Sequence, residues 1–256
     1  MVGMIFAAGL GTRLKPLTDT MPKALVPLAG KPLLQWQVEK LRDAGISDII
    51  VNVHHFPDMI IDTVRANKGW GCNILISDER DLLLDTGGGL KKALSLIPNS
   101  LIPNPILACN VDILSNIDLR AFINNYQSPI ANRQSPLGVL VVSDRSTQRY
   151  LCFDENGRLC GWTNIKTGEL KGQDGRHLAF SGMQILTPEI LSRLQEMPQD
   201  KFSLIDFYMS LCERTITNHQ SPITNLKAYI PDAFRMMDVG KIDQIEEAES
   251  FAQALC

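Results

Sequence analysis

Two glycines, an arginine and a lysine follow a short apolar run near the start of the chain, in the segment FAAGLGTRLKP (6–16). Glycine allows a backbone to approach a ligand closely, and basic side chains neutralise phosphate oxygens, so this segment could bind a nucleotide. It fails the dinucleotide pattern G-x-G-x-x-G because position 14 is Leu14, and it fails the P-loop pattern because Pro16 follows Lys15. A third kind of nucleotide-binding turn remains, or else a plain tight turn.

Two aspartates stand close to the ends of predicted elements. Asp112 emerges two residues after a predicted strand at 105–110, and Asp238 lies just before the last predicted helix. Ligands of open α/β sheets bind beyond the carboxyl ends of the strands. Two carboxylates without a nearby His or Cys suit a hard cation such as Mg²⁺, and Arg13 and Lys23 beside the glycine turn suit phosphates. Taken singly, either aspartate is more often a helix cap, and Lys23 could simply be solvated.

A second glycine cluster lies in DTGGGL, residues 85–90. The segment could be a flexible loop that leads into a helix. Three consecutive glycines cost backbone entropy, however, and that cost is easier to justify where a flat ligand lies against the chain. The cluster is therefore a second candidate for ligand contact.

The first half of the chain alternates between strand and helix periodicities. Short apolar runs predict strands, and apolar residues spaced three or four apart predict helices. The predicted strands are 4–8, 48–53, 73–77 and 105–110, and the predicted helices are 33–45, 58–67 and 88–97. This alternation favours an α/β fold with a mostly parallel sheet and helices on both faces.

The pattern changes after about residue 136. The prediction there is a strand at 137–142, a hairpin at 150–163 that turns at Asn156-Gly157, a strand at 180–186, and helices at 188–194, 203–214 and 241–255. No linker or repeat interrupts the sequence. We therefore predict a single domain over 1–256, in which 1–136 binds the nucleotide and 137–256 contributes a small mixed lid.

Composition excludes several classes of protein. The 256 residues carry a net charge of −3, whereas nucleic-acid binders usually have a basic excess. Six cysteines show neither a C-x-x-C pair nor zinc spacing, which is typical of reduced thiols in a cytoplasmic protein. No apolar run approaches the ~20 residues that span a bilayer, and the charge order near the N-terminus is wrong for a signal peptide. We expect a cytoplasmic monomer or small homo-oligomer that binds neither nucleic acid nor membrane.

The glycine turn belongs to a longer motif. Residues 7–36, AAGLGTRLKPLTDTMPKALVPLAGKPLLQW, closely resemble the signature G-x-G-T-R-(x)-x-P-x-T-x-x-x-P-K-x-L of the sugar-1-phosphate nucleotidyltransferases. The resemblance continues in DTGGGL, NVD, FSGMQIL and MDVG and so covers essentially the whole chain. Within the family, the chain is most similar to the short uridylyltransferases that act on N-acetylmuramate 1-phosphate. The resemblance implies a Rossmann-like nucleotidyltransferase fold without the C-terminal β-helix of the long members.

The resemblance also implies roles for individual residues. Arg13 would hold the phosphates that leave as pyrophosphate, Lys23 would neutralise the α-phosphate, and Asp112 and Asp238 would ligate Mg²⁺. Many relatives have an aromatic residue two positions before the second aspartate, where this chain has Met236. The other implied contacts are Ala7, Ala8, Gly9, Gly11, Glu79, Gly87 and Gly88 with the nucleotide and Lys166 and Gly182 with the sugar phosphate, so that 137–256 supplies sugar binding and the second metal ligand.

The implied reaction joins a nucleoside triphosphate to a sugar 1-phosphate and releases pyrophosphate. Its nucleophile is an anionic phosphate oxygen that needs no general base, in keeping with a sequence in which no histidine has an obvious catalytic partner. The expected substrates are UTP and N-acetylmuramate 1-phosphate or a similar sugar phosphate. The alternatives are guanylyl transfer to mannose or heptose 1-phosphate, then thymidylyl transfer or cytidylyl transfer to phosphocholine, and a non-catalytic nucleotide-sugar sensor. A dinucleotide-dependent oxidoreductase is disfavoured, because the second strand ends in NVHH without an acidic residue for a ribose.

Overall fold

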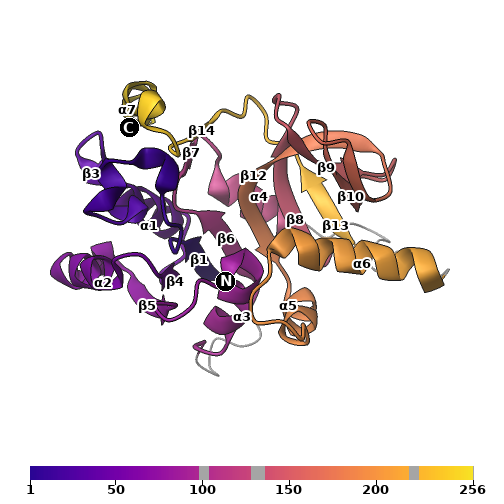
Figure 1. The fold of residues 1–256 in the computed structure, drawn as a ribbon, viewed down its shortest axis with the longest axis horizontal. Helices are drawn as coiled ribbons and strands as arrows, with labels where there is room; N and C mark the ends of the chain where they lie inside the picture. Colours follow the sequence, from indigo (N-terminus) through magenta and orange to yellow (C-terminus); the bar gives the residue numbers. More distant parts are fainter. Residues whose placement is uncertain (98–103, 128–135, 219–224, 256) are drawn as a thin grey trace.

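One large sheet runs through the molecule (Figure 1). The computed structural model describes residues 1–97, 104–127, 136–218 and 225–255. The strand order is β11-β10-β9-β12-β6-β1-β4-β5, with β8 paired to β12 and β13 paired to β8. The strands of the first half are β1 (Val2–Phe6), β4 (Asp48–Val53), β5 (Asn73–Asp78) and β6 (Ile106–Asn110), and they pair in parallel. This confirms the predicted parallel sheet at the centre of an α/β fold.

The second half of the chain extends the same sheet with mainly antiparallel pairs. Its strands are β8 (Gly138–Ser143), β9 (Arg149–Phe153), β10 (Leu159–Asn164), β11 (Glu169–Gly172), β12 (Arg176–Leu186) and β13 (Leu226–Tyr229). Strands β9 and β10 form the predicted hairpin. Strand β12 pairs antiparallel with β6 in its C-terminal half and with β9 in its N-terminal half. The two halves of the chain therefore share one sheet.

Helices cover both faces of this sheet, as predicted. Neighbouring side chains of a strand point to opposite faces, so Ile5 and Ile49 enter one apolar cluster whereas Met4 and Ile50 enter the other. The first cluster packs under α1 (Leu33–Asp43), α2 (Pro57–Ala66), α4 (Leu119–Gln127) and α7 (Ile245–Gln253), and the second under α3 (Asp85–Leu94), α5 (Pro188–Gln195) and α6 (Leu204–Asn218). No helix among the described residues has the length and apolar character needed to cross a membrane.

Several boundaries differ from the prediction, among them those of β1, α3 and the last helix. Strand β1 ends at Phe6 rather than at residue 8, because the Ala7 amide donates to the side chain of Asn52. Helix α3 begins at Asp85, three residues before the predicted start, and so contains the glycine cluster. The last helix starts only at Ile245, after a 3₁₀ turn at Ile242–Gln244. In the first two cases a contact with a distant segment sets the boundary.

Candidate active site

A hollow of about 490 Å³ opens beyond the carboxyl ends of β1, β4 and β6. This is the edge at which an open parallel sheet binds its ligands. The hollow is lined by Phe6, Ala7, Ala8, Gly9, Lys23, Asn52, Leu83, Asp85, Thr86, Asn110, Val111, Asp112 and Lys201. Five residues predicted from the sequence thus meet in one place: Ala7, Ala8, Gly9, Lys23 and Asp112.

Gly9 and Gly11 of the first turn play different structural roles. Gly11 has a φ of 66° in the left-handed region, and a Cβ there would lie 2.8 Å from Thr18 Cγ2. The Thr18 hydroxyl donates to the Gly11 carbonyl over 2.8 Å, which fixes this turn. At Gly9 a Cβ would meet nothing within 4 Å. Gly11 therefore shapes the turn, whereas Gly9 leaves open space on the wall of the pocket.

A buried polar chain ties this turn to the next loop. The Ala7 amide donates to Asn52 Oδ1 over 2.8 Å, and Asn52 Nδ2 donates to Glu79 Oε1 over 2.7 Å. Glu79 Oε2 in turn accepts from the Leu84 amide over 3.2 Å. Burial raises the pKa of Glu79, which is only 1% exposed. Glu79 therefore lies behind Asn52 as its support and does not itself line the hollow.

The two basic residues of the motif lie in different environments. Lys23 is 8% exposed, begins a 3₁₀ turn at Lys23–Leu25, and forms an ion pair with Asp112. Arg13, in the 3₁₀ turn Thr12–Leu14, is exposed, and its Nη2 lies 3.8 Å from Asp238 Oδ2. The chain thus holds a buried and an exposed cation beside the two aspartates. Lys23 is not a merely solvated lysine.

A short strand pair brings the aspartates together. Strand β7 (Ile113–Ser115) pairs antiparallel with β14 (Met236–Asp238), with Asp238 opposite Ile113. The Val239 amide donates to the Asp112 carbonyl over 2.8 Å. Neither aspartate adjoins the start of a described α-helix, since α4 begins at Leu119 and α7 at Ile245. The helix-cap interpretation therefore fails for both.

The chemistry of this pair fits a cation. Asp238 Oδ1 is buried and accepts no hydrogen bond from any residue that the structure describes. Burial, followed by the nearby charge of Asp112, raises the pKa of Asp238. An orphaned carboxylate oxygen next to a second carboxylate offers the oxygen ligands that Mg²⁺ prefers.

The glycines of α3 have another explanation than the expected ligand contact. A Cβ on Gly87 would lie 2.4 Å from the Phe202 ring, and one on Gly88 would lie 2.0 Å from the Asp200 carbonyl oxygen. The amides of both glycines donate to the Phe202 carbonyl. The segment 200–202 therefore packs directly on the helix, and Gly87 and Gly88 lie behind it rather than on the wall of the hollow.

Neither of the two residues predicted for the sugar phosphate lines the hollow. Gly182, with a φ of 73°, packs against Asn110, because a Cβ there would lie 2.7 Å from Asn110 Nδ2. It thus lies directly behind a lining residue. Lys166 is exposed in the turn after β10 and does not line the hollow. Its assignment stays a prediction that the structure does not strengthen.

Several lining residues were not predicted. Asn52 could have been noticed, because it is the one polar residue inside the apolar run of β4. Asp85 has a φ of 62°, a backbone conformation that residues other than glycine rarely adopt. Neither this strain nor the approach of Lys201 from a distant loop leaves a signal in the sequence.

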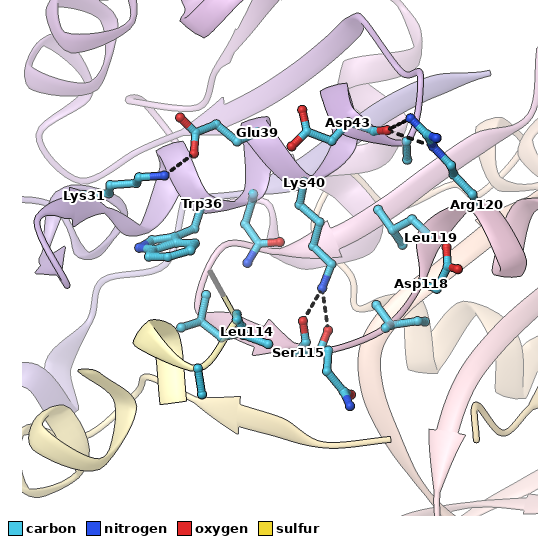
Figure 2. A pocket seen from close by; sticks show the side chains of 16 residues that line it. Lys31, Trp36, Glu39, Lys40, Asp43, Leu114, Ser115, Asp118, Leu119 and Arg120 are labelled. Carbon is cyan, nitrogen blue, oxygen red and sulfur yellow. Dashed lines mark hydrogen bonds and ion pairs between the residues drawn. The ribbon is translucent and has the colours of Figure 1, made fainter. Parts of the chain in front are cut away.

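A second hollow, of about 610 Å³, lies between α1 and β7 and is lined by none of the predicted residues (Figure 2). Lys40 of α1 crosses it to donate to the carbonyl and the hydroxyl of Ser115, over 2.6 and 2.8 Å. Burial lowers the pKa of Lys40 to about 8. Because Ser115 lies in β7, this contact holds the strand that pairs with the Asp238 segment.

Comparisons with known proteins agree with this geometry. The family described as nucleotidyl transferase matches residues 2–254. The N-acetylmuramate alpha-1-phosphate uridylyltransferase of Caulobacter vibrioides is 33% identical over 217 residues, which are 82% of this chain and 84% of that protein. The protein of the same name from Neisseria meningitidis is 32% identical over 195 residues, 76% of this chain and 79% of its own. The crystal structure of HddC from Yersinia pseudotuberculosis complexed with GMP-PN has a TM-score of 0.71 at 25% identity and covers 98% of this chain and 99% of its own.

Proposed function

We propose that the chain condenses a nucleoside triphosphate with a sugar 1-phosphate to give a nucleotide sugar and pyrophosphate. The chain belongs to the nucleotidyl transferase family, from which the proposal proceeds. The expected pair is UTP and N-acetylmuramate 1-phosphate or a similar sugar phosphate. Two relatives that carry this activity in their names support the pair, at 33% and 32% identity over most of the chain. The charged, phosphorylated substrates suit the cytoplasm.

The observation that carries the proposal is the meeting of Lys23, Asp112 and Asp238 beside the glycine turn. In our proposal the backbone at Ala7, Ala8 and Gly9 faces the nucleotide, since these residues line the hollow and Gly9 leaves room beside its backbone. Gly11 acts indirectly by shaping the turn. Nucleotidyl transfer requires two polyanions to be oriented in line and their charge neutralised, which these residues are able to do.

Lys23 and Arg13 are suited to different phosphates of the nucleotide. Buried Lys23 offers a fixed ammonium next to Asp112, suited to the α-phosphate at which the new bond forms. Exposed Arg13 offers a planar guanidinium with donors for two oxygens of the departing pyrophosphate. The attacking phosphate oxygen is already anionic, so no side chain has to remove a proton. Mg²⁺ held by Asp112 and Asp238 would supply further neutralisation of the phosphate charge.

Pyrophosphate release from a matrix of substrates tests the proposal. The chain is mixed with UTP, GTP, dTTP or CTP and with a panel of sugar 1-phosphates, at saturating Mg²⁺. We expect the largest kcat/KM for UTP with N-acetylmuramate 1-phosphate. A larger kcat/KM for UTP with a sugar phosphate unlike N-acetylmuramate 1-phosphate would contradict the sugar assignment. No turnover with any pair would contradict an enzyme and favour a non-catalytic nucleotide-sugar sensor.

Guanylyl transfer is the second candidate. The similarity to HddC, solved with the nucleotide GMP-PN, favours it specifically. A preference for GTP with mannose or heptose 1-phosphate in the same matrix would decide for this alternative.

A further inference from the structure

A second group of metal-binding side chains lies in the antiparallel part of the sheet. It consists of Cys152 in β9, Asp174 in the turn between β11 and β12, and His177 near the start of β12. The Cys152 sulfur, a carboxylate oxygen of Asp174 and a ring nitrogen of His177 all lie within 4.8 Å of one another. None of these three residues lines the hollow described above.

The register of the sheet produces this grouping. Cys152 and His177 are directly opposite each other in the antiparallel pair of β9 and β12, and opposed residues project from the same face. The turn that carries Asp174 lies tightly against the same strand, because a Cβ on Gly175 would lie 2.4 Å from the Phe153 carbonyl oxygen. The sheet thus brings Asp174 and His177, which follow Cys152 by 22 and 25 positions in the sequence, next to Cys152. This explains why the sequence shows no zinc spacing.

Two of the distances between the ligand atoms are close to those around a bound zinc ion. His177 Nε2 lies 2.6 Å from Asp174 Oδ1, and Cys152 Sγ lies 3.9 Å from the same oxygen. In a tetrahedral zinc site, neighbouring N, O and S ligands are about 3.3–3.6 Å apart, given metal–ligand distances near 2.0–2.3 Å. The His–Asp pair therefore has to open and the Cys–Asp pair to close, each by a fraction of an ångström.

The group has a buried side and an exposed side. Cys152 is fully buried, whereas Asp174 and His177 are exposed at the surface. The His177 ring stacks on Tyr150, with 5.6 Å between ring centroids and 21° between planes, which restricts its orientation. The group is open to solvent on one side and closed by a sulfur on the other.

We propose that Cys152, Asp174 and His177 bind Zn²⁺ or a similar borderline divalent cation, with water in the fourth position. A set of one sulfur, one nitrogen and one oxygen suits such cations, whereas Mg²⁺ prefers oxygen alone. Binding releases the proton of the Cys152 thiol to solvent, and the proton of the His177 ring moves from Nε2 to Nδ1, so that the neutral ring binds the metal through Nε2. The bound cation ties β9, β12 and the intervening turn together.

Cobalt tests the site, because a thiolate bound to Co²⁺ gives a charge-transfer absorption that oxygen ligands do not give. The full chain, stripped with chelator, is titrated with Co²⁺ in excess Mg²⁺, so that Asp112 and Asp238 contribute no signal. We expect one Co²⁺ per chain with this absorption, and its loss when Zn²⁺ is added. Absence of the absorption would overturn the proposal.

Substitutions assign the ligands. His177→Ala and Asp174→Ala change exposed side chains and should weaken Co²⁺ binding by about tenfold or more, and Cys152→Ser should abolish the absorption. The matched control is Cys160→Ser, since the Cys160 sulfur faces backbone carbonyls instead, 3.3 Å from that of Cys152. It should keep both the affinity and the absorption. Loss of the absorption in Cys160→Ser, or full affinity in His177→Ala, would overturn the three-ligand site.

Thermal unfolding gives a second readout that does not depend on the spectrum. A cation that binds only the folded chain raises its Tm in proportion to the logarithm of its concentration. Zn²⁺ should raise the Tm of the wild-type chain and of Cys160→Ser by clearly more than that of His177→Ala, whose metal-free Tm should equal that of the wild type. An equal Zn²⁺ effect on His177→Ala would contradict the proposal.

Discussion

At the scale of single residues, Lys23 and Arg13, the two basic residues of the signature motif, differ most in solvent exposure. The Lys23 ammonium is held against Asp112 in a buried position, whereas Arg13 extends its guanidinium into solvent. A buried ion pair loses stability when one partner is removed, because the other charge stays behind unpaired. Arg13 is therefore the better residue for separating catalysis from folding.

We expect substitutions of Arg13 to reduce kcat without unfolding the chain. Lysine keeps the charge but loses the planar arrangement that holds two phosphate oxygens, so Arg13→Lys should be slower than the wild type. Arg13→Ala should be slower by roughly a hundredfold or more, as is typical for a donor that binds developing charge. Steady-state kinetics and Tm are the measurements. Rates within about threefold of the wild type for both variants would mean that Arg13 contacts no phosphate.

Asp238 should support activity at a cost in stability. Burial and the charge of Asp112 raise its pKa, so the folded chain holds this carboxylate ionised at a cost in free energy. Asp238→Asn removes the charge, and we expect the Tm without metal to stay equal or rise while Mg²⁺-dependent turnover is lost. A large drop in Tm would show that the carboxylate stabilises the fold instead. Turnover that persists in excess chelator would contradict its role as a ligand.

At the scale of the elements, the glycines of the two glycine-rich segments serve different purposes. Alanine substitutions at Gly88 and Gly9 distinguish these purposes. Gly88→Ala would force a Cβ to within 2.0 Å of the Asp200 carbonyl oxygen, so α3 and the 200–202 segment must move apart. We expect a loss of about 1–3 kcal/mol or more in the free energy of unfolding. Gly9→Ala places its Cβ in open space and should leave that free energy unchanged while it raises the KM for the nucleotide. Urea unfolding and kinetics of both variants are the measurements, and equal stability of the two would contradict this division.

Most elements of the fold are local enough to be predicted. The strand at 48–53 and the helix after residue 32 follow from their apolar periodicity, and the hairpin at Asn156-Gly157 follows from its turn residues. Helix α3 begins earlier than its pattern indicates. Its glycines disfavour a helix locally, but the contact with Phe202 from far along the chain outweighs that preference.

The candidate site was predictable in its residues rather than in their arrangement. The motif identified Lys23, Asp112 and Asp238, but β7 and β14 have only three residues each and leave no periodic pattern. Nothing in the sequence shows that Lys40 holds β7 from behind. Such supports depend on long-range pairing, which a single sequence does not reveal.

At the scale of the whole molecule, buried titratable groups couple the stability of the core to pH. Burial raises the pKa of Cys109 and of Cys152 to about 12, and that of Cys160 to about 11. The unfolded chain loses these thiol protons near pH 9, which favours unfolding. Lys40 acts in the opposite sense between pH 8 and 10.5, because the unfolded chain keeps its proton longer than the folded one.

The balance of these groups predicts alkaline unfolding. Three thiols outweigh one lysine, so the free energy of unfolding should fall above pH 9 by up to about 3 kcal/mol per pH unit, since each proton contributes about 1.4 kcal/mol per unit. Urea unfolding of the metal-free chain at intervals from pH 7 to 10 measures this slope. Cys109→Ala should make it shallower by up to about 1.4 kcal/mol per unit, whereas Lys40→Met should make it steeper because it removes the opposing group. The cavity left at Cys109 lowers the free energy of unfolding by the same amount at every pH, so it does not change the slope measured for that variant. A wild-type free energy that does not change between pH 9 and 10 would mean that these thiols ionise as readily in the folded chain as in the unfolded one.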